Sequence, residues 1–162
     1  MNTIDNKIKE LNNQHLYEIR RILNRYSYIF TKLREATPEE DMKQGFDAVF
    51  SFQDVKIPVR IRNSEYFERF ADFTIRSRSR FGKETEIDKL RSGFGDYYFY
   101  AWRNKDNTKI ARYVIVNLDV FRKSVIDRHG KEQHNNDGTQ FFPYGLFDMI
   151  KCGAVILYEK IL

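Results

Sequence analysis

The sequence has one cysteine, three prolines and no long apolar run, and the first and last of these shortages exclude whole classes of protein. A single cysteine, Cys152, cannot form an internal disulfide, which is typical of proteins that fold in a reducing compartment. No apolar run approaches the roughly 20 residues of a membrane-spanning helix. The first residues, MNTIDNKIKELNNQ, lack the apolar stretch of a signal peptide. We therefore expect a cytoplasmic protein with no membrane partner.

What the chain does contain is enough to build a hydrophobic core. Its 162 residues are the size of one ordinary domain, and its hydrophobic content of 41% and aromatic content of 15% exclude a disordered polymer. The sequence holds no internal repeat, low-complexity tract or linker. Residues 1–162 are therefore expected to form a single domain.

Positive charge gathers in the middle of the chain. Between Val55 and Arg112 there are 14 Lys and Arg against 8 Asp and Glu, whereas the remainder has 14 against 15. The net charge of +5 therefore comes entirely from this middle third. A localised basic field is typical of a face that binds a polyanion such as nucleic acid, although a solvated face has the same composition.

At the centre of this basic region lies the stretch FTIRSRSR, in which three arginines alternate. Alternate residues of an extended strand project to one face, so the pattern predicts a row of guanidinium groups. A glycine and the start of a predicted helix follow, and helix amides there also favour anions. The acidic side chains of that helix are expected to face away from a bound nucleic acid. The candidate nucleic-acid-binding residues are Arg76, Arg78, Arg80 and Lys83.

Apolar periodicity and turn residues predict an α+β fold with a mixed or antiparallel sheet. The predicted helices cover residues 5–34, 37–45, 83–91, 118–126 and 143–150. The predicted strands cover residues 46–52, 56–62, 70–78, 97–102, 110–118 and 154–158, and two pairs of them form hairpins. Pro58 indicates that the strand over 56–62 lies at an edge or is irregular. Residues 127–138 are expected to form a loop.

A set of carboxylates and arginines accompanies the first predicted hairpin. Asp47 opens one strand, and Arg60 and Arg62 share a face of the next. Glu35, Glu40 or Asp41, near the ends of the two preceding predicted helices, could supply a second carboxylate. Converging carboxylates hold Mg²⁺ in the way that phosphodiester hydrolysis requires. The alternative is a simple ion pair between Asp47 and an arginine, and spacing alone favours it.

Two other groups of residues are interpreted as structural. The run from Gly93 to Trp102 is rich in aromatic residues that could stack on bases. In a strand, however, Tyr98, Tyr100 and Trp102 face one way, and such a row normally forms core. The loop with His129 and His134 has a weak metal-binding pattern and is interpreted as solvated.

Two stretches of the chain, residues 36–62 and 72–102, resemble a family of small, largely uncharacterised phage and prophage proteins. The shared elements are AT-x-E-x-D, (V/C)RxR, FTIR, G-x-x-TE and G-x-GDYxFYG, with Ala101 in place of the last glycine. They cover just over a third of the chain. The resemblance implies a phage or mobile-element origin and brings no settled activity.

A more distant resemblance is to the PD-(D/E)XK nucleases, whose core runs α-β-β-β-α-β. Asp47 matches the motif aspartate, and Glu35 or Glu40 matches the helical glutamate. Arg60 and Arg62 stand where the family has (E/Q)-x-K, and an arginine neither ligates a metal nor readily gives up a proton. The resemblance therefore implies a nuclease-like fold whose chemistry is degenerate or differently built.

Three functions remain for these residues. In a Mg²⁺-dependent phage nuclease acting on DNA, Asp47 with Glu40 or Asp41 would hold the metal, and Arg60 or Arg62 would stabilise the phosphate. The same basic face would also serve a non-catalytic protein that binds a nucleic acid or a nucleotide. Of the nucleic acids, DNA is expected rather than RNA. The third function is a phage accessory, virion or inhibitor protein that binds an acidic protein in the host cytoplasm. We rank a nuclease-like fold that binds nucleic acid first and leave catalysis open.

Overall fold

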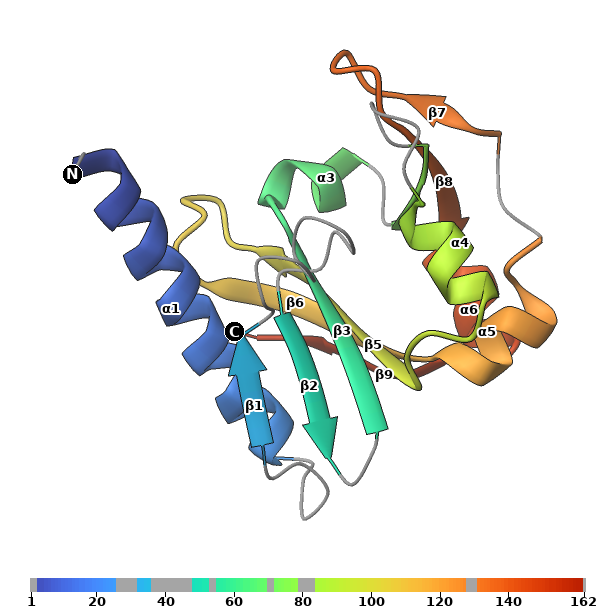
Figure 1. Ribbon diagram of the computed structural model, residues 1–162, viewed down its shortest axis with the longest axis horizontal. Helices are drawn as coiled ribbons and strands as arrows, with labels where there is room; N and C mark the ends of the chain where they lie inside the picture. The colour runs from blue at the N-terminus through green and yellow to red at the C-terminus, as the bar shows by residue number, and fades with distance from the viewer. Residues whose placement is uncertain are drawn as a thin grey trace.

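A computed structural model of the chain describes residues 3–25, 32–35, 48–52, 55–69, 72–78, 84–127 and 131–161 (Figure 1). Its helices there are α1 (Thr3–Arg25), α3 (Ser64–Arg69), α4 (Glu86–Arg91), α5 (Leu118–Ser124) and α6 (Leu146–Lys151). Its strands there are β1 (Lys32–Glu35), β2 (Ala48–Phe52), β3 (Val55–Arg62), β4 (Asp72–Arg78), β5 (Tyr97–Arg103), β6 (Ile110–Asn117), β7 (Gln133–His134), β8 (Gln140–Gly145) and β9 (Val155–Lys160). None of the described helices is long and apolar enough to cross a membrane. The predicted helix over 37–45 lies outside the described residues.

Six strands form a large mixed sheet in the order β1-β2-β3-β5-β6-β9. The neighbouring pairs are antiparallel except β3 and β5, which run parallel with Val59 opposite Phe99. Both predicted hairpins are confirmed, since β2 pairs with β3 and β5 pairs with β6. The connection from β3 to β5 carries α3, β4 and α4, which places these elements over one face of the sheet (Figure 1).

The remaining strands form a small antiparallel sheet in the order β4-β8-β7. The predicted strand over 70–78 therefore exists as β4, but it does not join the large sheet. Two shorter elements also differ from expectation: β7 interrupts the predicted loop over 127–138, and α6 begins at Leu146 because Pro143 belongs to β8. The α+β class is confirmed.

One prediction near the amino terminus is wrong. The predicted helix over 5–34 ends at Arg25, and residues 32–35 pair with β2 as a strand, with Leu33 opposite Phe50. Lys32–Glu35 contains one apolar residue, Leu33, which fits a helical and a strand pattern alike, and pairing with β2 decides between them. Of the two alternatives for the strand that contains Pro58, the structure excludes an edge strand, because β3 lies between β2 and β5. The pairing of β3 with β5 begins at Val59, the residue that follows Pro58.

The large sheet separates two hydrophobic cores. On one face α1 contributes Ile19, Ile22 and Leu23, which belong to one core with residues of β3, β5 and β6. On the other face Tyr98, Tyr100 and Trp102 are each 1% exposed or less and pack with residues of β4, β8, α4, α5 and α6. The expectation that this aromatic row forms core is confirmed.

Candidate anion-binding site

The free edge of β4 lies against the large sheet, and polar side chains of other elements bind its amides. The Thr74 amide donates to the Tyr100 hydroxyl at 3.4 Å, and the Arg76 amide donates to the Glu86 carboxylate at 3.0 Å. Between them Ile75 is fully buried in the hydrophobic core. An edge strand whose amides are buried needs such partners, because unpaired backbone groups are costly away from water.

Glu86 is the carboxylate at the centre of this junction. It is the first residue of α4, whose start is fixed by a capping box in which the Thr85 amide donates to Asp88 at 2.9 Å. Glu86 is 3% exposed; its carboxylate pairs with the Arg60 guanidinium and accepts a hydrogen bond from the Tyr98 hydroxyl. Of the acidic side chains of this helix, Glu86 therefore points toward the arginines of β3 and β4.

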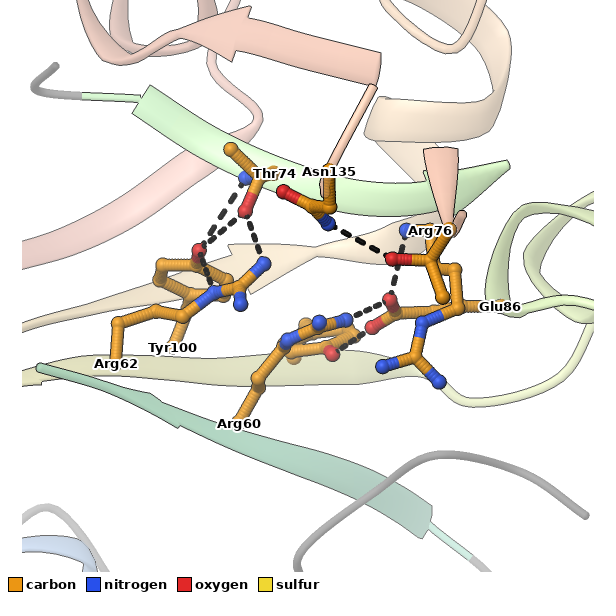
Figure 2. Close-up of polar contacts among 9 residues, drawn as sticks. Arg60, Arg62, Thr74, Arg76, Glu86, Tyr100 and Asn135 are labelled. Atoms are coloured by element: carbon orange, nitrogen blue, oxygen red, sulfur yellow. Dashed lines mark hydrogen bonds and ion pairs between the residues drawn. The ribbon is translucent and has the colours of Figure 1, made fainter. Parts of the chain in front are cut away.

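Arg62 is held by a second set of polar side chains, which lies beside the contacts of Glu86 (Figure 2). Its Nε donates to the Tyr100 hydroxyl at 3.0 Å and its Nη2 to the Thr74 hydroxyl at 2.6 Å, and these two hydroxyls lie 2.8 Å apart. Arg60 and Arg62 therefore share the face of β3 that looks toward β4, as the alternation predicts. Both side chains reach across to elements far away in the sequence.

Arg76 extends from β4 toward the same place (Figure 2). Its side chain is partly buried, and no side chain within the described ranges accepts a hydrogen bond from its guanidinium. Burial lowers the pKa of Arg76, and the positive charges of Arg60 and then Arg62 lower it further, while Glu86 and Asp137 oppose this shift. We call Arg60, Arg62 and Arg76 the arginine cluster.

Among the residues that the structure describes, the arginine cluster carries more positive charge than the neighbouring carboxylates of Glu86 and Asp137. Of the three guanidinium groups, only that of Arg60 pairs with the buried Glu86 carboxylate, whose charge also acts on Arg76, and Asp137 of the β7–β8 connection adds a second negative charge near Arg76. Like charges in a partly desolvated place repel, so an added anion lowers the electrostatic energy there. The planar donors of arginine fit phosphate and carboxylate oxygens in pairs. The cluster is therefore suited to bind an anion.

A β-bulge separates Arg76 from Arg78. Along the β4–β8 ladder, Arg76 lies opposite Phe141 and Arg78 lies opposite Gln140. The register therefore advances by two residues along β4 and by only one residue along β8. Neighbouring residues of β8 point to opposite faces, and the bulge therefore puts Arg76 and Arg78 on opposite faces of the small sheet. The prediction of an unbroken row of arginines on one face is wrong for this pair. Arg80 and Lys83 lie outside the described residues.

The predicted metal and catalytic carboxylates cannot be placed. Asp47, Glu40 and Asp41 lie outside the described residues, and Glu35 belongs to β1 rather than to a helix. Within the part of the chain that the structure describes, no group of three or more His, Cys, Asp or Glu could hold a metal ion. The magnesium site over Asp47 and Asp41 stays a prediction.

The partners of the arginines were not foreseen from the sequence. Glu86, Tyr98, Tyr100 and Thr74 hold the cluster together, and the tyrosines were interpreted only as core. One signal was present: Glu86 and Leu90 are four residues apart, so Glu86 shares the apolar face of the helix. A second signal is general, since a buried tyrosine hydroxyl usually finds a polar partner.

No protein-family model, no curated protein and no solved structure matches this chain. The function is therefore argued from the geometry of the arginine cluster.

Proposed function

We propose that this protein binds nucleic acid through its phosphates, with Arg76 and Arg62 at the contact. The observation that carries the proposal is the partly buried Arg76 guanidinium, which has no hydrogen-bond acceptor among the described residues and lies near Arg60 and Arg62. Natural sequences rarely bury a charged group without direct partners unless it has a use. The excess of basic residues between Val55 and Arg112 supports a polyanion over a small single anion.

The members of the cluster have different roles in this proposal. Arg60 is 8% exposed and paired with Glu86, so it contributes its field and fixes the geometry. Arg62 and Arg76 are more accessible and would donate to phosphate oxygens. Glu86 is a positioning residue, because it holds both the Arg60 guanidinium and the Arg76 amide.

A nuclease-like fold of phage origin is proposed for the same chain. The order α1, β1, β2, β3, α4, β5 supports an α-β-β-β-α-β core, with α3 and β4 inserted before α4. Hydrolysis would need Asp47 with Glu40 or Asp41 and Mg²⁺, and these residues lie outside the described part of the chain. The proposed function is accordingly binding.

The bulge in β4 supplies a matched pair of variants to test this function. Arg76→Ala and Arg78→Ala remove the same charge two residues apart on one strand, but only Arg76 belongs to the cluster. In fluorescence anisotropy with a short DNA duplex, we expect Arg76→Ala to weaken binding about tenfold or more and to reduce the salt slope by about 0.9. Arg78→Ala should change the affinity by less than about threefold.

Equal losses in the two variants would refute a specific role for the cluster. If the wild-type chain does not bind duplex DNA at physiological salt, the nucleic-acid proposal fails and an acidic protein partner is favoured. Cleavage that requires Mg²⁺ and disappears in Asp47→Ala would extend the proposal from binding to hydrolysis.

A further inference from the structure

Exposed apolar side chains gather on two consecutive elements, α6 and β9. Five large hydrophobic side chains are exposed among the described residues, and four of them lie there. Phe147 and Ile150 of α6 are 76% and 49% exposed, and Ile156 and Tyr158 of β9 are 54% and 44% exposed. We call these four the α6–β9 patch. Clustered apolar exposure of this kind marks contact sites more often than scattered exposure does.

Two opposite charges lie beside the apolar residues of α6. Asp148 and Lys151 are both exposed and three residues apart, the same spacing as Phe147 and Ile150. Neither charge forms an ion pair with any residue that the structure describes. The exposed surface of α6 therefore has an apolar and an acidic side chain near its start, and an apolar and a basic side chain near its end.

A hollow of about 420 Å³ adjoins this helix. Its walls come from the end of α5, from Tyr144 and Gly145 at the end of β8, and from Asp148, Lys151 and Cys152. Gly145 leaves room beside Asp148 in the wall of this hollow, because an added Cβ there would lie 3.4 Å from the Asp148 carboxylate. The hollow is large enough to accept an aromatic side chain, since buried aromatic rings occupy far less than this volume.

We propose that two copies of this chain form a dimer by packing α6 against α6 about a two-fold axis. With the two-fold axis perpendicular to α6, the two helices run antiparallel and each contact occurs twice. Asp148 then meets the partner subunit's Lys151 beside the hollow, and Phe147 meets the partner subunit's Ile150. The pattern of α6 is self-complementary in charge, which selects a second copy of this chain over an unrelated partner. The dimer does not depend on the proposed nucleic-acid binding.

Charge reversal distinguishes this dimer from any other. In Asp148→Lys both symmetry-related ion pairs become Lys–Lys contacts, and in Lys151→Asp both become Asp–Asp contacts. The double variant Asp148→Lys/Lys151→Asp restores opposite charges across the axis. By sedimentation velocity over a concentration series, we expect a wild-type dimer, at least about tenfold weaker association in each single variant, and recovery in the double variant.

Two further variants separate the patch from general exposure of apolar residues. Phe147→Ser should weaken association about a hundredfold, because each dimer loses two buried rings. Tyr17→Ser removes a side chain that is 69% exposed on α1, away from the patch, and should leave association unchanged. Thermal melts of all variants show whether each is folded.

Three results would overturn the dimer: a wild-type chain that stays monomeric at every concentration, a folded double variant that does not associate, or equal effects of Phe147→Ser and Tyr17→Ser. Loss of the dimer with intact DNA binding would leave the nucleic-acid proposal standing, and the reverse would leave the dimer standing.

Discussion

At the scale of single residues, Glu86 has the largest structural role in the candidate site. Its carboxylate binds the Arg60 guanidinium, the Tyr98 hydroxyl and the Arg76 amide, which come from three different strands. Burial raises the pKa of Tyr98 well above its ordinary value, and the negative charge of Glu86 adds to this, so the hydroxyl stays protonated and donates. A neutral residue in place of Glu86 would remove the carboxylate that pairs with the buried Arg60 guanidinium.

Glu86→Ala should therefore destabilise the protein by about 3–5 kcal/mol, the cost typical of breaking a buried ion pair by removing one partner. The matched control is Asp127→Asn, which removes a carboxylate 81% exposed in its pair with Arg91. That substitution should cost no more than about 1 kcal/mol. Urea denaturation of both variants measures the difference. Similar costs for the two substitutions would show that Glu86 is not the anchor of the site.

His15 gives the protein a dependence on pH. Its ring is 1% exposed, and neither ring nitrogen has a hydrogen-bond partner among the described residues. Burial lowers the pKa of His15, and the charge of Arg103 lowers it further, while Glu18 at 3.6 Å partly opposes the shift. The unfolded chain therefore binds a proton more readily than the folded protein.

The consequence is a loss of stability in acid. The contribution of neutral His15 to the free energy of unfolding is complete above the ordinary pKa of 6.5. It declines as the pH falls below that value, by at most about 1.4 kcal/mol per pH unit. Denaturation measured from pH 7.5 to pH 5 should show this decline, and His15→Gln should flatten it. A variant that declines as steeply as the wild-type protein would assign the acid sensitivity to other groups.

At the scale of elements, β4 shows where sequence patterns stop being informative. The hairpins β2–β3 and β5–β6 are predictable because their strands are close in sequence and rich in β-branched and aromatic residues. The small sheet is not predictable in this way, because β4 pairs with β8, which lies about 70 residues later in the sequence. The bulge between Arg76 and Arg78 depends on that distant pairing, so the alternation of arginines predicts the wrong face for one of them.

The same limit applies to the candidate site. Charge and alternation single out Arg60, Arg62 and Arg76, and the structure brings all three together. What holds them is a carboxylate on α4 and hydroxyls on β4 and β5, and these contacts form only when the two sheets meet. A side chain's burial can be inferred from its helix face, but its partner belongs to the tertiary structure.

The turn between α4 and β5 provides a test at this scale. Gly93 and Gly95 both have positive φ angles, 94° and 79°. Residues other than glycine rarely adopt such angles. A Cβ on Gly93 meets nothing within 4 Å, whereas one on Gly95 would lie 2.9 Å from Leu118 and 3.0 Å from Pro58.

Gly93→Ala should accordingly cost about 1–2 kcal/mol from backbone strain alone. Gly95→Ala should cost about 1–3 kcal/mol more, because it also overpacks the contact between β3 and α5. Urea denaturation compares the two variants. Equal costs would mean that Leu118 and Pro58 yield without penalty.

At the scale of the whole molecule, the arginine cluster lies where the two sheets meet. One face of the large sheet belongs to the core of α1, and the other supports the small sheet and three helices. The aromatic rings of β5 are consumed in that second core, so Tyr98, Tyr100 and Trp102 offer no surface on which bases could stack. What this junction presents to a ligand is charge.

Binding through charge without base contacts makes a specific prediction about nucleic acid. Affinity for duplex DNA should fall steeply with salt, with a slope of about −0.9 for each phosphate neutralised. Two duplexes of equal length and different sequence should bind within about threefold of each other, because phosphate contacts carry no sequence information. Anisotropy titrations at two or more salt concentrations measure both quantities. A shallow salt slope, or a strong preference for one sequence, would place the contact on base edges and away from the arginine cluster.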